Sequence, residues 1–465
     1  MNLPTTLRRK ATVAGMLALL LATSGCASVT RSTYKAPATP VAQAFDLTLS
    51  GSAATGTAPW WNNFDDRQLS AVVDEVLAAN PNLAAAGLTL RQARLSSQLS
   101  RQNLFPSGSA SASAAASKPL DGNGAGWNRS SSAALDTSWE IDLFGRLDAA
   151  ADAARWEAEA TQSDLASTRL SLIGTTVTTW WQLAYANQTI ALGETGIERS
   201  RKSLQLVRRS YDAGAVSALS LREAEQDLAS LEAQQTQLVQ ARVQALKTLA
   251  ALMGRQGYDG PQPTALPDGE LPTIPAGVPA QLLARRPDLA AAEQRLRGAL
   301  ATSDANVASY YPRFSLTGSL GGSSTSLTGF LSNPIASIGA LFSLPELNPE
   351  KIRLGTAVAR TTYRIAAEQF RTTFYNALRD TQIALSAREQ YVQQAGALQA
   401  ALVAAEAAEQ LYQRQYDVGL IPLRTLIDAR ERTRTARTSV IQNRFNAIDA
   451  QIQVYQSLGG DALAG

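Results

Sequence analysis

The amino-acid sequence is internally duplicated, and its two copies lie about 205 residues apart. The segment NPNLAAAGLTLRQA, which begins at Asn80, is matched by RPDLAAAEQRLRGA, which begins at Arg286. In each copy a Tyr-Asp-x-Gly motif follows, at residues 211–214 and at residues 416–419. A repeat this long predicts a scaffold of two equivalent units, whose function lies in its overall shape rather than in one pocket.

The N-terminus predicts a lipoprotein signal peptide. Basic residues 8–10 precede the apolar run 11–22, and Cys26, the only cysteine, follows small residues. The apolar run is too short for a spanning helix, so residues 1–25 are expected to be removed. The segment resembles a bacterial lipobox, with Thr23 in place of the usual leucine. This resemblance implies an N-palmitoyl and S-diacylglycerol lipid on Cys26 and an outer-membrane location, whereas a lone cysteine is otherwise most often a buried apolar residue.

Charge balance and residue types exclude several classes of function. The chain has 42 Lys and Arg against 39 Asp and Glu, and removal of the signal peptide leaves 39 of each sign, so no nucleic-acid partner is expected. Histidine is absent, so the usual nucleophile–base and metal constellations are missing. Glu140 and Asp142 are paired acids on one predicted strand face, without a cleft. We therefore expect no enzyme, no metal, and no cofactor other than the covalent lipid.

Four segments with a period of two predict β-strands. They are residues 107–118, 129–143, 313–325 and 336–346. In the second segment Leu135, Thr137, Trp139, Ile141 and Leu143 point one way, and Asp136, Ser138, Glu140 and Asp142 the other. This pattern fits a membrane barrel with a wet lumen, although it also describes any half-buried antiparallel strand. Since about eight strands are the minimum for a barrel, the chain must share strands with copies of itself: two copies would give eight strands, and three would give twelve.

The rest of the chain predicts long helical hairpins. Residues 147–209 contain no proline, and a second leucine-rich helix returns over 216–253; residues 352–414 and 422–458 repeat the arrangement. Gly214 and Gly419 fit the left-handed residue that ends a helix. The predicted organisation is a signal peptide (1–25), an acylated extended tether (26–62), repeat 1 (63–259, tip near 211–217), a proline-rich linker (260–280), repeat 2 (281–460, tip near 416–422) and a tail (461–465).

These features together resemble the TolC-like outer-membrane efflux factors, in particular the lipoprotein branch with OprM-type and NodT-type proteins. The matching segments are 59–61 with Phe64 and Asp66, 139–146 (WEIDLFGR), 285–289 (RRPDL), 291–294 (AAEQ), 311–312 (YP) and the two tip motifs. The resemblance implies an α+β membrane protein with internal duplication. Four strands per chain would contribute to a trimeric 12-stranded transmembrane β-barrel, which continues into a long periplasmic α-helical barrel of coiled-coil hairpins.

The resemblance also implies function and partners. The protein would be a homotrimer that docks through its helical tips to a periplasmic membrane-fusion adaptor and an inner-membrane RND-type pump. It would perform no chemistry and would act as a passive exit duct for drugs and other toxic solutes. Two alternatives remain open: a type I protein-secretion duct, and a structural periplasmic coiled-coil lipoprotein, which would leave the four strands unexplained. Metal-ion efflux is not excluded, because specificity normally lies in the pump.

The resemblance places a gate at the periplasmic tip of the second hairpin. Matched by position, Tyr416 and Asp428 fall on a tip tyrosine and a pore aspartate, and three such carboxylates around an axis would attract cations. The alternative is that Arg424 and Asp428 form an ordinary exposed pair one helical turn apart. Tyr211, Gly214, Tyr416 and Gly419 would shape the tips that face the adaptor, or serve simply as turn residues. For Trp139, an interfacial aromatic belt and packing at the barrel base are both open.

Overall fold

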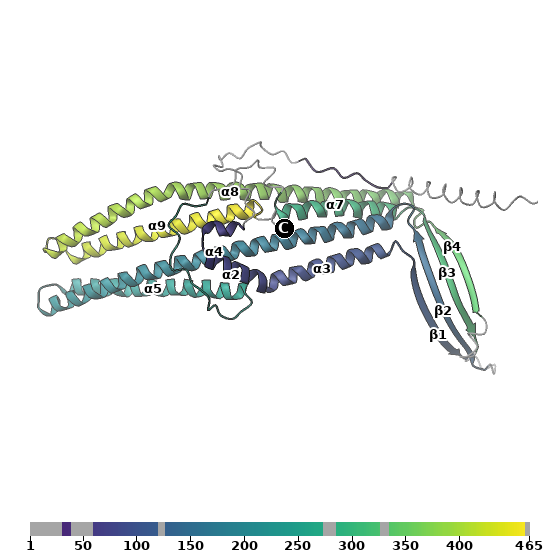
Figure 1. The fold of residues 1–465 in the computed structure, drawn as a ribbon, viewed down its shortest axis with the longest axis horizontal. Coiled ribbons are helices and arrows are strands. Elements are labelled where there is room, and N and C mark those ends of the chain that lie inside the picture. Colours follow the sequence, from purple (N-terminus) through teal and green to yellow (C-terminus); the bar gives the residue numbers. More distant parts are fainter. Residues whose placement is uncertain (1–29, 39–58, 120–125, 273–284, 326–333, 461–465) are drawn as a thin grey trace, which may run out of the picture. The chain divides into compact units, whose positions relative to one another are not determined.

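The computed structural model describes residues 30–38, 59–119, 126–272, 285–325 and 334–460 (Figure 1). The predicted signal peptide, Cys26 and most of the predicted tether lie outside the described residues. The chain divides into two compact units. The first, here called the sheet unit, comprises Met1–Thr39, Thr89–Gln162 and Ala291–Thr372. The second, the hairpin unit, comprises Pro40–Leu88, Ser163–Ala290 and Thr373–Gly465.

Each repeat contains one or more short helices, a strand pair and a long helical hairpin, in the predicted order (Figure 1). Repeat 1 has η2 (Trp60–Phe64), α2 (Arg67–Ala79), α3 (Pro81–Gln102), β1 (Ser107–Ser117), β2 (Asn128–Ile141), α4 (Arg146–Asp212) and α5 (Ala218–Leu252). Repeat 2 has α7 (Pro287–Ala308), β3 (Arg313–Ser324), β4 (Pro334–Ser343), α8 (Pro349–Asp417) and α9 (Leu423–Ser457). Helices α4 and α8 have 67 and 69 residues, far beyond the usual length in globular domains.

The sheet unit holds one antiparallel sheet with the order β1-β2-β3-β4. Residues paired across neighbouring strands share a face, so the register tests the predicted alternation. Leu135 pairs with Leu320, whereas the adjacent Asp136 pairs with Ser319. The first face, here called the apolar face, carries alanine, leucine, isoleucine, phenylalanine and tryptophan along all four strands. The opposite polar face is rich in hydroxyl groups, including Ser109, Ser111, Ser113, Ser132, Ser138, Ser315, Thr317, Ser319 and Ser337.

Strand β2 ends two residues earlier than the alternation predicts. Leu143 does not continue the strand, because its N–H donates to the carbonyl of Ile141 at 2.9 Å in a turn. Asp142 leaves the ladder as well, and its Oδ2 accepts a hydrogen bond from the backbone N–H of Asp148 at 2.8 Å. A carboxylate there satisfies a free donor in the first turn of α4. The prediction for Leu143 and Asp142 was therefore wrong: Asp142 caps a helix instead of lining the polar face.

The hairpin unit is organised around an aromatic core. Its buried members come mainly from η2, α2, α4, α5 and α9, and include Trp60, Trp61, Val73, Val177, Trp180, Trp181, Leu249, Ile448 and Ile452. The indole N–H of Trp180 donates to Asp66 Oδ2 at 2.9 Å, so its one polar group is satisfied inside the core. Trp60 stacks on Tyr455, with 5.0 Å between the ring centroids. The predicted tether therefore ends before Trp60, which belongs to the folded body.

Candidate functional site at the hairpin tips

Both long hairpins turn at a glycine in the left-handed conformation. Gly419 has φ of 75°, and its N–H donates to the carbonyl of Tyr416 at 2.9 Å, while Leu420 N–H donates to Gln415 at 2.9 Å. This bonding pattern closes the C-terminus of a helix and requires a residue that tolerates positive φ. Gly214 ends α4 in the same way, with φ of 72°.

Substitution of the tip glycine should loosen the tip. Gly419→Ala forces a Cβ into the left-handed region at a cost of about 1 kcal/mol, which raises hydrogen exchange of amides 410–425 by roughly fivefold. Gly396→Ala is the matched control, because Gly396 lies inside α8 and a Cβ added there would meet only open space. Alanine there stabilises the helix by about 0.5–1 kcal/mol and should slow exchange. Equal effects of the two substitutions would contradict a role for the left-handed turn.

A small apolar cluster joins the two hairpins near their tips. Val207 of α4 and Leu221 of α5 are buried against Leu423 of α9. Tyr416 packs against this cluster as a half-buried residue, so its ring lies between the hairpins of one chain. Tyr211, its counterpart in repeat 1, is 41% exposed. The repeat therefore places two equivalent tyrosines in different environments: Tyr416 packs against the cluster that joins the hairpins, and Tyr211 is exposed.

Asp428 and Arg424 form an ion pair on α9. Their Nε and Oδ1 atoms are 3.1 Å apart, and the side chains remain 56% and 41% exposed for Arg424 and Asp428 respectively. A pair with this exposure contributes only a few tenths of a kcal/mol to stability. The Asp428 carboxylate is thus accessible to ions or to another chain, and the pair contributes too little stability to be its only role.

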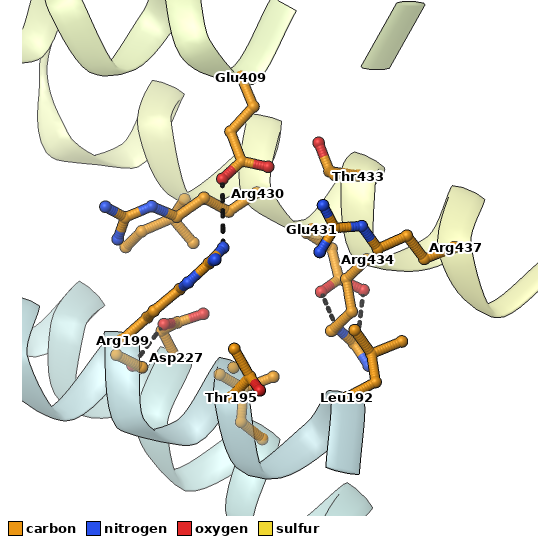
Figure 2. A pocket seen from close by; sticks show the side chains of 14 residues that line it. Leu192, Thr195, Arg199, Asp227, Glu409, Arg430, Glu431, Thr433, Arg434 and Arg437 are labelled. Atoms are coloured by element: carbon orange, nitrogen blue, oxygen red, sulfur yellow. Dashed lines mark hydrogen bonds and ion pairs between the residues drawn. The ribbon is translucent and has the colours of Figure 1, made fainter. Parts of the chain in front are cut away.

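A charged cavity of about 70 Å³ lies between the hairpins, beside the apolar cluster. Figure 2 shows Arg199, from α4, pointing at Glu409, from α8, with 3.9 Å between Nη1 and Oε1. Arg430, also at the cavity, donates to the neutral side chain of Gln413 at 2.7 Å. Arg199 and Glu409 make the polar bridge from one hairpin to the other at this level.

Other polar contacts at this level tie each hairpin to itself. Ser200 of α4 donates to Asp227 of α5 at 2.6 Å, and Arg437 of α9 donates to Glu406 of α8 at 2.6 Å. Sequence analysis did not identify these residues. No motif marks them, and the partners across the hairpins are about 200 residues apart, so only the folded arrangement pairs them.

Apolar side chains project into solvent at both turns. Val418 and Leu420, on either side of Gly419, are 71% and 75% exposed, and Leu219 just after the first turn is 67% exposed. Isolated exposed apolar residues are common, but a group of them on a tight turn is typical of a protein-binding surface. The two tips thus offer paired apolar contacts that a single chain leaves uncovered.

The described part of the predicted tether, residues 30–38, is bound along the sheet unit; here it is called the strap. Thr30 Oγ1 donates to the carbonyl of Phe144 at 2.6 Å. Ser32 donates from both its N–H (2.8 Å) and its hydroxyl (2.7 Å) to the carboxylate of Asp304 on α7. Asp304 is only 5% exposed, and a buried carboxylate without donors is costly. The strap therefore supplies contacts that α7 needs.

Two further residues hold the strap electrostatically. Arg31 pairs with Asp148 and, at 2.6 Å, with Asp152 on the first turns of α4. Burial lowers the pKa of Arg31, but the hydrogen bond to Asp152 and the charges of both aspartates outweigh this and raise it. The guanidinium of Arg297 lies over the ring of Tyr34, with 4.5 Å between Cζ and the ring centroid. The strap thus joins α4 of repeat 1 to α7 of repeat 2.

Loss of the strap contacts should release this segment. In Arg31→Ala/Ser32→Ala, removal of three charge-assisted contacts costs at least about 1.4 kcal/mol, and hydrogen exchange over residues 30–38 should rise tenfold or more. Lys35→Ala serves as the control, because Lys35 is exposed on the same segment. An unchanged exchange rate in the double variant would show that the contacts do not hold the strap.

Within the described ranges, no helix is both long and apolar enough to cross a membrane. The same part of the chain contains no group of three or more His, Cys, Asp or Glu side chains that could bind a metal ion.

Two repeats, each with a strand pair and a long helical hairpin, define a channel-type scaffold rather than a pocket protein. A sequence model described as "Outer membrane efflux protein" matches residues 72–255 and again residues 278–460. The chain belongs to the outer membrane efflux protein family. The two matches coincide with the two copies of the internal repeat.

Curated relatives and solved structures agree with this family. The chain is 28% identical over 449 residues to "Toxin and drug export protein A" of Aggregatibacter actinomycetemcomitans, which covers 96% of this chain and 97% of the relative. It is 28% identical to "Solvent efflux pump outer membrane protein SrpC" of Pseudomonas putida, over 85% and 86% of the two chains. The open-state MtrE outer membrane channel of Neisseria gonorrhoeae superposes with a TM-score of 0.82 at 26% identity, over 93% and 98% of the chains. The fold is that of outer-membrane efflux channels.

Proposed function

We propose that this chain is the exit duct of a tripartite efflux pump, a homotrimer that carries solutes from an inner-membrane RND-type pump and a periplasmic adaptor across the outer membrane. The observation that supports this most directly is the strand register, which keeps one face mainly apolar across the four strands and gathers hydroxyl groups on the other face in β1, β2 and β3. Such a sheet fits lipid on one side and water on the other. Three copies would supply the twelve strands of a closed barrel.

The proposed gate is the tip of the second hairpin. Tyr416 would hold the two hairpins together through the apolar cluster, and Asp428, positioned by Arg424, would face the pore axis. Three carboxylates around a narrow axis attract cations. The ion pair of Arg199 and Glu409, at the cavity between the hairpins, would hold the second hairpin against the first. Tyr211, Gly214, Tyr416 and Gly419 would shape the surface that meets the adaptor.

The solutes are proposed to be drugs or other small toxic molecules. The names of two relatives refer to toxin and drug export and to solvent efflux. In this chain the polar face carries mainly hydroxyl groups. Of its three charged residues, Asp136 and Arg313 have opposite signs, and Glu140 is paired with Arg146 at 2.8 Å. A wall of mainly short hydroxyl side chains selects little by charge, as expected if the pump rather than the duct determines which solutes are exported. Catalysis is not part of the proposal.

Cys26 is proposed to carry the N-palmitoyl and S-diacylglycerol lipid. Mass spectrometry of the mature protein tests this, because cleavage of the signal peptide removes residues 1–25 and lipidation adds mass to Cys26. Cys26→Ser should leave the signal peptide attached.

The function is tested by the mass of the purified oligomer and by planar-bilayer conductance from the same preparation, together with drug susceptibility of a host that lacks its own outer-membrane duct. The proposal expects a trimer, a channel and restored drug resistance. A channel that restores export of a secreted protein but not drug resistance would favour the type I secretion duct. Absence of both trimer and channel would favour a structural coiled-coil lipoprotein.

A further inference from the structure

The apolar face of the sheet carries a single charged residue, at one end. The four strands contain four charged residues: Arg129, Asp136 and Glu140 in β2 and Arg313 in β3. Asp136, Glu140 and Arg313 lie on the polar face, since they alternate with residues such as Leu135 and Phe314. Arg129 pairs with Ala116 and shares the parity of Ala133 and Leu135, so it lies on the apolar face.

Arg129 lies at the end of the β1–β2 hairpin where the two strands do not continue into helices; this end is here called the edge. The last ladder pair is Ser117 with Asn128, and Lys118 and Trp127 are the next residue on either strand. Both are exposed, and Trp127 is 63% exposed. Among the described residues of this edge, 116–119 and 126–131, there is no acidic side chain. Two cations and an indole therefore lie together at the edge of an apolar surface.

The cost of burying charge in lipid restricts where this edge can lie. An arginine on the lipid-facing side of a barrel costs about 2–4 kcal/mol at the bilayer midplane and about 0–1 kcal/mol near an interface. Arg129 is therefore tolerated only at the level of the lipid headgroups. Tryptophan is enriched at that level, because its ring is apolar and its N–H is polar. A guanidinium binds phosphate in a bidentate manner, and an ammonium binds it as a point charge.

We propose that Lys118, Trp127 and Arg129 form a binding site for a phosphate-bearing lipid headgroup in the outer leaflet. The proposal rests on the proposed function, because only a sheet inserted in a membrane places this edge in a lipid surface. The described ends of β3 and β4, at Ser324, Thr325 and Pro334, carry no charge. The site thus occurs once per chain, in repeat 1 alone, and would repeat three times around a trimer.

Delipidated protein in neutral detergent is titrated with diphosphoryl lipid A, and binding is counted by native mass spectrometry. Wild type should retain lipid A, and Lys118→Gln/Arg129→Gln should bind it at least tenfold more weakly. Arg101→Gln, an exposed arginine in the last turn of α3, is the control and should bind like wild type. Binding by the double variant within twofold of wild type would overturn the site, and so would an equal loss in the control.

Two further arms identify the ligand source. Phosphatidylcholine should displace bound lipid A poorly, because its ammonium group neutralises the charge of its phosphate. Inorganic pyrophosphate should also displace it poorly, because it lacks acyl chains. Equal competition by pyrophosphate would replace the lipid proposal with a free-phosphate site. Bilayer conductance of the same preparations distinguishes failure of this lipid site from failure of the proposed efflux duct. Conducting protein without lipid A binding refutes only this site, and lipid A binding by protein that forms neither a trimer nor a channel refutes the efflux duct.

Discussion

Asp428→Ala should lower the cation selectivity of the channel by roughly tenfold. A monovalent ion about 8 Å from a carboxylate gains about 2 kcal/mol at an effective dielectric constant of 20, so a ring of carboxylates enriches cations strongly. The Asp428 side chain is 41% exposed and forms only one weak ion pair, with Arg424, so its removal changes the field more than the fold. Planar-bilayer reversal potentials in a salt gradient measure the selectivity directly.

The control for this experiment is Glu198→Ala. Glu198 pairs with Lys202 one helical turn away on α4, at 2.6 Å, and both side chains are more than two-thirds exposed. It therefore removes the same kind of carboxylate from the same kind of pair, but in the first hairpin. Selectivity that is unchanged in Asp428→Ala, or lowered equally by both substitutions, would reduce Asp428 to a surface residue. Arg424→Ala should have the opposite sign and increase cation preference, because it leaves the Asp428 carboxylate unpaired.

The second large effect is expected from Trp180→Ala, which should destabilise the hairpin unit by about 3–5 kcal/mol. Trp180 has no exposed surface, and its removal empties the centre of the aromatic core. It also leaves Asp66 Oδ2 without the indole donor. The apparent melting temperature should fall by roughly 10 °C, as measured by circular dichroism in detergent.

Two variants separate packing from hydrogen bonding. Trp180→Phe keeps much of the apolar area but loses the N–H donor, so it should cost less than Trp180→Ala. Asp66→Ala removes the acceptor, and also the cap that binds the backbone N–H of Gln68 and Leu69 at the start of α2. A Trp180→Ala protein that melts like wild type would show that the core does not determine the stability of this unit.

The strands and hairpin turns could be predicted because their signals are local. Alternation along residues 129–141 depends only on neighbouring residues, and the register of β2 with β3 confirms it. The turns at Gly214 and Gly419 were also predictable, since a left-handed helix end strongly favours glycine. Leu143 shows the limit of this reasoning: its side chain continued the pattern, but a turn before Gly145 had already ended the strand.

The contacts that join distant segments could not be predicted from local pattern. Arg199 and Glu409 are separated by more than 200 residues, and exposed charged residues are abundant on both long helices. The strap is a similar case, because the Ala-, Thr-, Ser- and Pro-rich segment 27–59 is typical of a free linker. Ser32 is bound by the buried carboxylate of Asp304, and the burial of Asp304 depends on how α7 packs.

The strap would limit the reach of a lipid attached to Cys26. Cys26 precedes Thr30 by four residues, and a fully extended chain of that contour length reaches about 14 Å. Thr30 is itself fixed to Phe144, at the junction between β2 and α4. Acyl chains on Cys26 would therefore enter the leaflet close to that junction, at a high effective concentration relative to the sheet. Such an anchor would limit how far the sheet can move along the membrane normal.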